Sequence, residues 1–453
     1  MEEERSLELT AHQSPPEARA YTVPLKKSDV DSMHRASFLS LLKNHWQRIK
    51  SPETAFIEEI PLQEQVLNEK RLATYFGEIE IGGQPFRVLF DTGSCEFWIP
   101  SYHCTQFTSP PERCQRHDKY NPGTSKTYQP FREDQKMSIQ YLSGKVEGGL
   151  AKDTVRLGDL EVKEQVFGMA DEVDVPLLDE VVWDGIVGLA YPNKKLAAAG
   201  VKPLFDTVID HHQLQNNVLS YYLGYNGGAI TLGGVDERFI ASEETPATLR
   251  GAHAFSHVQS SPQPTTMLEL ASRSSHPFVY AKVVEESYWT IEIMDIELQY
   301  GDEEPRATGV CDSQENGRCR AIVDTGTYLI YGPRADVTGA LGDVELSSCK
   351  DIKEMPKITF VMYAGEEAEP ARLTLHPHDY VLEFHLPTDG EANCNKAENR
   401  DDPDKCRADC VIGIGPDNDD GWTLGQVFLR SFYTVFDRDS DRVGFVRSNP
   451  NAL

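Results

Sequence analysis

The chain has 453 residues, with 44 basic against 72 acidic side chains and a formal net charge of −28. This length predicts two large lobes or three modest domains. The acidity argues against nucleic-acid and anionic-membrane partners, which bind through clustered lysines and arginines. No run of about 18–20 apolar residues occurs, so we expect no membrane span.

The N-terminal part changes character twice. Residues 1–20 are polar and rich in glutamate, which predicts a flexible tail. Residues 21–27 alternate like a strand, and apolar residues recur at helical spacing over 29–50. Segment 21–50 carries six basic and two acidic residues, a net +4 in an otherwise strongly acidic chain. We therefore expect a short strand and a basic helix before the main body.

Short β-type runs separated by Gly, Pro and Asn begin near residue 72 and predict a mostly β protein. Two stretches interrupt them. Residues 241–277 have low complexity, and residues near 387–420 are dense in Asp, Asn and Gly, so we expect surface insertions there. The body then divides into an N-terminal lobe at 66–240 and a C-terminal lobe at 278–453.

The nine cysteines bear on the cellular compartment. The close pairs Cys104/Cys114 and Cys311/Cys319 are typical of small disulfide loops and lack zinc-type spacing. The N-terminus lacks the positive start and apolar stretch of a signal peptide. We expect a protein of the secretory pathway, in a vesicular or vacuolar lumen or extracellular, whose leader is absent from this numbering. An odd count leaves at least one cysteine unpaired.

A short motif occurs once in each half of the chain, as Val-Leu-Phe-Asp-Thr-Gly-Ser at 88–94 and Ala-Ile-Val-Asp-Thr-Gly-Thr at 321–327. One Asp-Thr-Gly alone predicts little more than a turn. Two copies, each after a hydrophobic strand and each followed by a hydroxyl residue, indicate function. The glycines permit tight turns in which backbone N–H groups approach the carboxylates, to which the hydroxyls can also donate.

Paired acids give this repeat a specific chemistry. Two carboxylates held within a few Å cannot both ionise, because their repulsion raises one pKa, so Asp91 and Asp324 are expected to share one proton. The ionised member can take a proton from a bound water while the other donates to a substrate carbonyl. Such a pair hydrolyses a peptide bond without a metal or covalent intermediate, so we expect no cofactor.

Further motifs resemble those of pepsin-family aspartic proteases over about residues 60–453. Trp98-Ile-Pro-Ser follows the first repeat copy, and the runs at 183–192 and 422–438 resemble the strands behind the two aspartates. The run 139–144 (Ile-Gln-Tyr-Leu-Ser-Gly) resembles the flap hairpin, whose tyrosine closes over substrate and bonds to an indole N–H. The paired aspartates of this family are the standard example of carboxyls with separated pKa values.

This resemblance implies an all-β, bilobal double barrel with a central cleft and a short helical N-terminal prosegment. The implied site has Asp91 and Asp324 as catalytic residues, supported by Gly93, Ser94, Gly326 and Thr327, with Trp98, Tyr141 and Gly144 at the flap and substrate cleft. The implied disulfides are Cys104–Cys114, Cys311–Cys319 and Cys349 with one of Cys394, Cys406 and Cys410.

The implied function is an aspartic endopeptidase made as a zymogen. Segment 21–65 resembles an inhibitory prosegment, whose Lys26, Lys27 or another base would contact the aspartates. Acid weakens its ion pairs with the body and should open the cleft. Expected partners are protein or peptide substrates and the chain's own prosegment, in a monomer. Two alternatives remain: a catalytically silent pepsin-fold binding or inhibitor protein, and an interaction module acting through acidic loops.

The sequence departs from the family at Cys95, Tyr328 and the flap tip, where Leu142 and Lys145 are unusual. The long insertions, the absent glycosylation sequons and the diverged flap resemble those of plasmepsin-like proteases of apicomplexan parasites. The histidines at 211–212 and 376–378 lack cysteine or carboxylate partners at ligand spacing, so we expect no metal site.

Overall fold

The computed structural model describes residues 58–67, 70–132, 135–141, 144–214, 216–225, 227–241, 278–342, 344–366, 368–388, 394, 399, 402 and 404–453. The predicted tail at 1–20, the strand and helix of 21–50 and nearly all of the low-complexity stretch at 241–277 lie outside these residues, as does Leu142.

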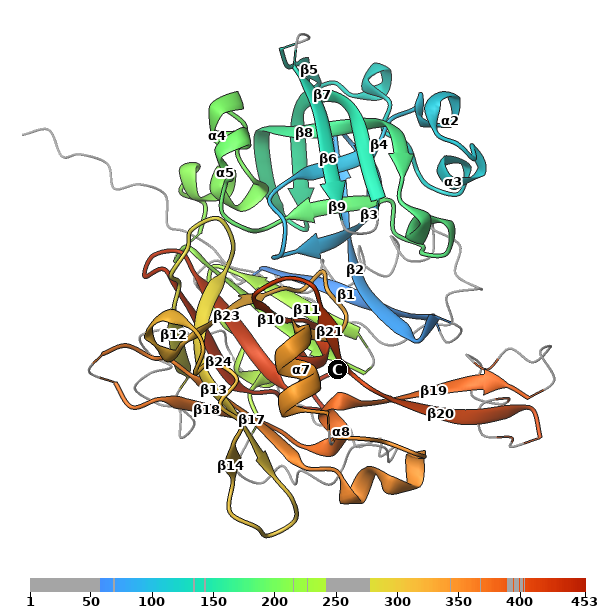
Figure 1. The fold of residues 1–453 in the computed structure, drawn as a ribbon. Coiled ribbons are helices and arrows are strands. Elements are labelled where there is room, and N and C mark those ends of the chain that lie inside the picture. Colours follow the sequence, from blue (N-terminus) through green and yellow to red (C-terminus); the bar gives the residue numbers. More distant parts are fainter. Residues whose placement is uncertain are drawn as a thin grey trace, which may run out of the picture.

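Two lobes make up the molecule, one built mostly from the blue and green part of the chain and the other mostly from the yellow to red part (Figure 1). Strands dominate both lobes and the helices are short, which confirms the predicted all-β, bilobal architecture. Within the described part of the chain, no helix combines the length and apolarity needed to cross a bilayer.

The larger sheet contains the strands of the N-terminal lobe and continues through the centre of the molecule. Its order is β12-β24-β23-β10-β11-β1-β2-β3-β9-β4-β8-β7-β5, with β6 paired to β7. The strands are β1 (Glu58–Leu67), β2 (Leu72–Ile81), β3 (Gln84–Asp91), β4 (Phe97–Pro100), β5 (Gln129–Pro130), β6 (Lys136–Tyr141), β7 (Gly144–Leu157), β8 (Leu160–Asp174), β9 (Gly185–Gly188), β10 (Val218–Gly224), β11 (Gly227–Leu232), β12 (Val279–Lys282), β23 (Phe432–Asp437) and β24 (Arg442–Arg447).

The second sheet belongs to the C-terminal lobe and runs β18-β17-β13-β15-β22-β16-β21, with β14 paired to β13. Its strands are β13 (Thr290–Gln299), β14 (Arg306–Ala307), β15 (Cys319–Val323), β16 (Ile330–Pro333), β17 (Lys357–Met362), β18 (Ala371–Leu375), β21 (Ile414–Asp417) and β22 (Trp422–Leu424). A separate two-stranded ribbon pairs β19 (Val381–Pro387) with β20 (Cys406–Ile412).

Helices are short and connect or cover strands. The α-helices are α2 (Cys104–Phe107), α3 (Glu112–Gln115), α4 (Lys194–Ala199), α5 (Leu204–Asp210), α7 (Arg334–Ala340), α8 (Pro377–Tyr380) and α10 (Gln426–Leu429). The 3₁₀ turns are η2 (Pro122–Thr124), η3 (Pro176–Asp179), η4 (Glu237–Phe239), η5 (Glu315–Gly317) and η6 (Cys349–Glu354).

Each repeated motif follows a strand in the interior of its sheet. Strand β3 lies between β2 and β9, and β15 lies between β13 and β22. Both are flanked on two edges by other strands, so their hydrophobic residues, such as Val88 and Val323, are fully buried. The two acids therefore stand at the ends of rigid, well-packed strands.

Strand β1 shows that the folded body begins before residue 66, where the sequence placed the boundary of the N-terminal lobe. Residues 58–62 pair with β11 and residues 63–67 pair with β2, so β1 connects the two parts of the larger sheet. Glu58 and Glu59 are buried in this position. The last part of the predicted prosegment is thus an interior strand.

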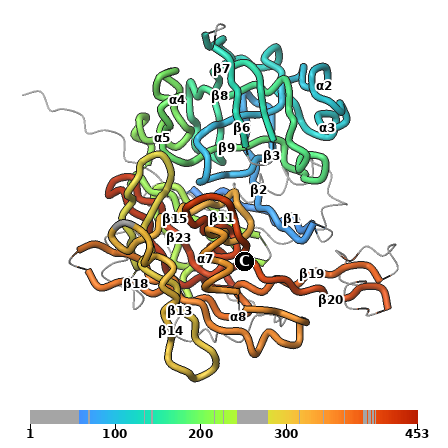
Figure 2. The backbone as a smooth tube through the Cα atoms, in the orientation of Figure 1, coloured from blue at the N-terminus to red at the C-terminus, as the bar shows by residue number. Residues whose placement is uncertain are grey.

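Part of the predicted insertion at 387–420 is regular structure. It includes strands β20 and β21. The β19–β20 ribbon extends away from the C-terminal lobe (Figures 1 and 2), and an ion pair of 2.6 Å joins Asp409 of this ribbon to Arg71.

Candidate active site

The two Asp-Thr-Gly loops have matching surroundings. β3 runs parallel to β9, with Asp91 opposite Gly188, and β15 runs parallel to β22. The backbone of Asp91 accepts from Leu189 N at 2.7 Å, and the backbone N of Asp324 donates to Leu424 O at 3.1 Å. In both lobes a parallel neighbour strand therefore fixes the backbone at the aspartate.

The loops meet so closely that each glycine faces the aspartate of the other loop. A Cβ added to Gly93 would lie 2.3 Å from Cγ of Asp324, and one added to Gly326 would lie 2.3 Å from Oδ1 of Asp91. No side chain fits in either position. The requirement for glycine thus comes from the approach of the two loops, since neither glycine has a positive φ that would itself exclude other residues.

Each carboxylate accepts one hydrogen bond from the glycine N–H and one from the hydroxyl of its own loop, and Asp324 also accepts from Thr327 N at 3.2 Å. Asp91 accepts from Gly93 N at 2.8 Å and from Ser94 Oγ at 2.5 Å. Asp324 accepts from Gly326 N at 2.7 Å and from Thr327 Oγ1 at 2.6 Å. These donors fix the orientation of the two carboxyl groups.

Asp91 is almost completely buried, with 7% of its surface exposed. Its pKa lies well above the ordinary range for aspartate, first because burial disfavours the charged form and second because the Asp324 carboxylate is adjacent. The hydrogen bonds from Ser94 and Gly93 oppose this rise. At mildly acidic pH the two carboxyls can therefore hold one proton between them.

A pair of threonines joins the two loops, a contact that was not predicted from the sequence. Thr92 N donates to Thr325 Oγ1 at 2.9 Å, and Thr325 N donates to Thr92 Oγ1 at 3.0 Å. The hydroxyls in turn donate to Val323 O and Phe90 O, both at 2.8 Å. The signal was present in the repeat, where both middle residues are threonine.

The β6–β7 hairpin places Tyr141 beside Trp98. The indole Nε1 of Trp98 donates to Tyr141 Oη at 2.9 Å, and Tyr141 pairs with Gly144 across the end of the hairpin. Burial raises the pKa of Tyr141 and the charge of Asp91 raises it further, so its hydroxyl stays protonated. The structure thus brings the predicted flap residues into one hydrogen-bonded group near Asp91.

A family model described as eukaryotic aspartyl protease matches residues 74–257 and 271–448. The chain belongs to this family. Plasmepsin VII of Plasmodium berghei (strain Anka) is 35% identical over 86% of this chain and 76% of its own length. Plasmepsin VII of Plasmodium falciparum (isolate NF54) is 33% identical, covering 86% and 82%. Cathepsin D of Chionodraco hamatus is 32% identical, covering 83% and 81%. These relatives agree with the predicted resemblance to pepsin-type and plasmepsin-like proteases.

All nine cysteines of the chain are accounted for. The structure contains disulfides Cys104–Cys114, Cys311–Cys319, Cys349–Cys410 and Cys394–Cys406. Of the three partners left open for Cys349, the structure has Cys410.

The remaining cysteine, Cys95, is free and buried. It follows Ser94 directly, and the backbone of Gly188 packs against it. Burial raises the pKa of its thiol to about 12. The thiol is therefore protonated and behaves as a small apolar group beside the paired acids.

The other departures from the family also have defined surroundings. Tyr328 accepts a hydrogen bond of 3.0 Å from Arg430, whose guanidinium also lies 5.3 Å from the tyrosine ring centroid. Lys145 forms an ion pair of 2.8 Å with Glu147 along the hairpin. Among the residues that the structure describes, no group of three or more His, Cys, Asp and Glu is arranged to hold a metal ion.

Proposed function

We propose that this chain is an aspartic endopeptidase that hydrolyses peptide bonds with a water held between Asp91 and Asp324. The observation that carries the proposal is the mutual placement of the acids: each glycine backbone lies against the opposite carboxyl, and matching donors hold both. Membership of the aspartyl protease family supports the same reaction. We propose that the chain acts as a monomer and that its substrates are proteins or peptides.

In the proposed reaction the pair begins with one proton. The ionised carboxylate removes a proton from the water as its oxygen attacks the peptide carbon, while the protonated carboxyl donates to the carbonyl oxygen. A tetrahedral diol forms. The carboxyl that took the water proton then gives it to the amide nitrogen, and the C–N bond breaks. The other carboxylate takes a hydroxyl proton from the diol as the carboxylic acid forms, so the pair returns to its single-proton state. Tyr141, held by Trp98, would cover the substrate above Asp91.

An inactive pepsin-fold binding protein would have no need to keep the complete set of groups. Both aspartates, both glycines, both hydroxyls and the Trp98–Tyr141 bond are present. The direct test compares the native chain with Asp324→Asn on a peptide library at pH 4 to 7, with and without a pepstatin-type inhibitor. Asp302→Asn, an exposed carboxyl in the same lobe, is the matched control.

We expect cleavage by the native chain and by Asp302→Asn, blocked by the inhibitor, and none by Asp324→Asn. Cleavage that survives Asp324→Asn would overturn the proposal. Binding of peptides without cleavage by the native chain would favour the silent alternative.

We also infer that the chain is made as a zymogen, because the segment 21–50 carries a net +4 against an acidic body. Its ion pairs weaken as carboxylates protonate, so acid should release it. The maturation cut should precede Glu58, because β1 lies between β11 and β2 and its removal would leave one edge of each of these strands unpaired. Incubation at pH 4 to 5 followed by N-terminal sequencing tests both points; no shortening, or a first residue beyond Leu67, would contradict them.

The disulfides bear on where the protein folds. Four of them occur in one chain, and such bonds persist in oxidising compartments. We therefore propose the secretory pathway or a lumen derived from it. Imaging of the tagged protein in its native cell, with a lumenal marker as reference, tests this placement, and diffuse cytosolic signal would contradict it.

A further inference from the structure

We propose that Arg113 is a positioning residue for the hairpin that carries Tyr141. Arg113 lies in the loop closed by the Cys104–Cys114 disulfide and is 6% exposed. This inference deepens the proposed function, because it concerns the hairpin that would close over substrate.

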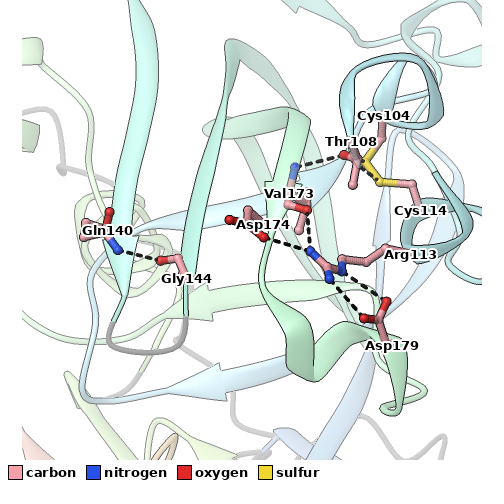
Figure 3. Close-up of polar contacts among 9 residues, drawn as sticks. All are labelled: Cys104, Thr108, Arg113, Cys114, Gln140, Gly144, Val173, Asp174 and Asp179. Carbon is pink, nitrogen blue, oxygen red and sulfur yellow. Dashed lines mark hydrogen bonds and ion pairs between the residues drawn. A yellow bond between two sulfur atoms is a disulfide. The ribbon is translucent and has the colours of Figure 1, made fainter. Parts of the chain in front are cut away.

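The guanidinium of Arg113 joins two acids on either side of one turn. Its Nη1 donates to Asp174 Oδ1 at 3.0 Å, while Nε and Nη2 donate to the two carboxylate oxygens of Asp179 at 3.1 and 3.0 Å (Figure 3). Nη1 also lies 3.4 Å from Val173 O. A planar guanidinium suits this set of acceptors, and a lysine ammonium cannot reproduce it.

The turn held in this way runs from the end of β8 to the end of η3, directly beside the hairpin. Lys145 is the register partner of Asp174. Gly144 has φ of 148°, and a Cβ added there would lie 1.8 Å from Asp174 O. The hairpin end therefore rests against the backbone of Asp174, with no space for adjustment between them.

The same turn supplies part of the apolar support of Tyr141. Val175 and Leu178 are buried in one cluster with Trp98 and Ile139, and Tyr141 packs against this cluster. A displacement of the turn would thus alter the position of Tyr141 in two ways, through the contact with Gly144 and through the apolar cluster.

The disulfide loop attaches to this turn by polar bonds at several further points. Thr108 Oγ1 accepts from Val173 N at 2.9 Å, and it lies 3.2 Å from Cys114 Sγ (Figure 3). Arg116 donates to Asp179 O, and Nε2 of His117 lies 2.8 Å from Leu178 O. Arg113 is the buried charged member of this group, so its loss would remove the cation that pairs with both Asp174 and Asp179.

The first test measures hydrogen exchange in Arg113→Lys. This variant keeps the positive charge but loses the planar guanidinium that donates to both carboxylates. Peptides covering 136–150 should exchange about tenfold faster than in the native chain, whereas peptides covering 72–91 should be unchanged. Arg156→Lys is the control, because Arg156 pairs with Glu161 at the far end of β7. Unchanged exchange over 136–150 would overturn the proposal, and this readout does not depend on catalysis.

The second test is a kinetic double-mutant cycle with Tyr141→Ala. Arg113→Lys should raise KM about fivefold, with kcat within about twofold, and should have almost no effect once Tyr141 is absent. Equal effects in both backgrounds would show a structural role only and overturn the proposal. If the native chain cleaves no peptide, the proposed function fails while hydrogen exchange still decides the role of Arg113. If Arg113→Lys does not fold, Asp174→Asn replaces it, because that side chain is 71% exposed.

Discussion

Thr92 and Thr325 hold the two Asp-Thr-Gly loops together by donating backbone N–H bonds to each other's hydroxyls, at 2.9 and 3.0 Å. Both side chains are buried, at 0% and 2% exposure. The two residues come from different lobes and lie directly beside Asp91 and Asp324 in sequence. The spacing of the acids therefore depends on this pair of side chains, which themselves take no part in proton transfer.

Thr92→Ala should destabilise the protein more than Thr92→Ser does. The alanine variant leaves Val323 O and Thr325 N without their partner, at about 1–3 kcal/mol for each buried unsatisfied group. Urea unfolding at pH 5 measures the difference, in an Asp324→Asn background that prevents self-digestion. Equal unfolding midpoints for the two variants would contradict this account of the loop contact.

Ser94→Ala should move the acid limb of the kcat/KM profile to higher pH. The Ser94 hydroxyl donates to the Asp91 carboxylate and so stabilises its ionised form; without that bond the pKa of Asp91 rises further. A shift of about 0.5–1 pH unit is expected. Peptide cleavage from pH 3 to 7 provides the measurement, with the exposed Ser347→Ala as control. A shift to lower pH would show that the Ser94 hydroxyl does not stabilise the ionised form of Asp91.

Glu58→Gln should remove a pH dependence of stability that originates in β1. Burial raises the pKa of Glu58 to about 8 from an ordinary value of 4.5, which the bond from Asp159 N only partly opposes. The folded state thus favours the protonated acid. This contribution is complete below about pH 4.5 and is lost as pH rises towards 8.

The native chain should therefore lose more unfolding free energy than Glu58→Gln between pH 4.5 and 8, and the variant should be the more stable at pH 8. The difference should exceed about 1 kcal/mol, since one pKa unit corresponds to about 1.4 kcal/mol. Urea unfolding at both pH values checks this, and parallel curves for the two proteins would contradict it.

An alkylating reagent should modify one thiol per chain, and only after the protein is unfolded. Cys95 is buried and protonated, and the other cysteines are in disulfides. Iodoacetamide at pH 8 should leave the native protein unmodified and should label Cys95 alone in urea without reductant. Mass spectrometry of the intact protein checks this. Rapid labelling of the native chain would show that the thiol is accessible beside Asp91.

The meeting of Asp91 and Asp324 was predictable because the sequence repeats the same acid-bearing motif in each half of the chain. Each Asp-Thr-Gly motif follows a hydrophobic strand, and the motifs form a paired-acid site in any fold that brings them together. The flap residues were predicted from the family resemblance. The Thr92–Thr325 contact was not predictable in the same way, because the motif does not indicate which backbone group will bind the threonine hydroxyl.

Other features depend on tertiary placement that no local pattern encodes. Arg113 meets Asp174 and Asp179 about 60 residues further along the chain, with no motif linking them. The predicted boundary at residue 66 divides strand β1, whose Gln- and Glu-rich sequence gives little sign of an interior strand. Its position follows from backbone pairing, of residues 58–62 with β11 and of residues 63–67 with β2.

The most direct test of the paired-acid account is a comparison of kcat/KM for Asp91→Asn, Asp324→Asn and the double variant on one peptide. Two acids that share one proton act as a unit, so each single variant should lose at least about a thousandfold, and the double variant should be no slower than either. Multiplying losses, or substantial activity in one single variant, would show that one carboxyl works alone and would contradict the account.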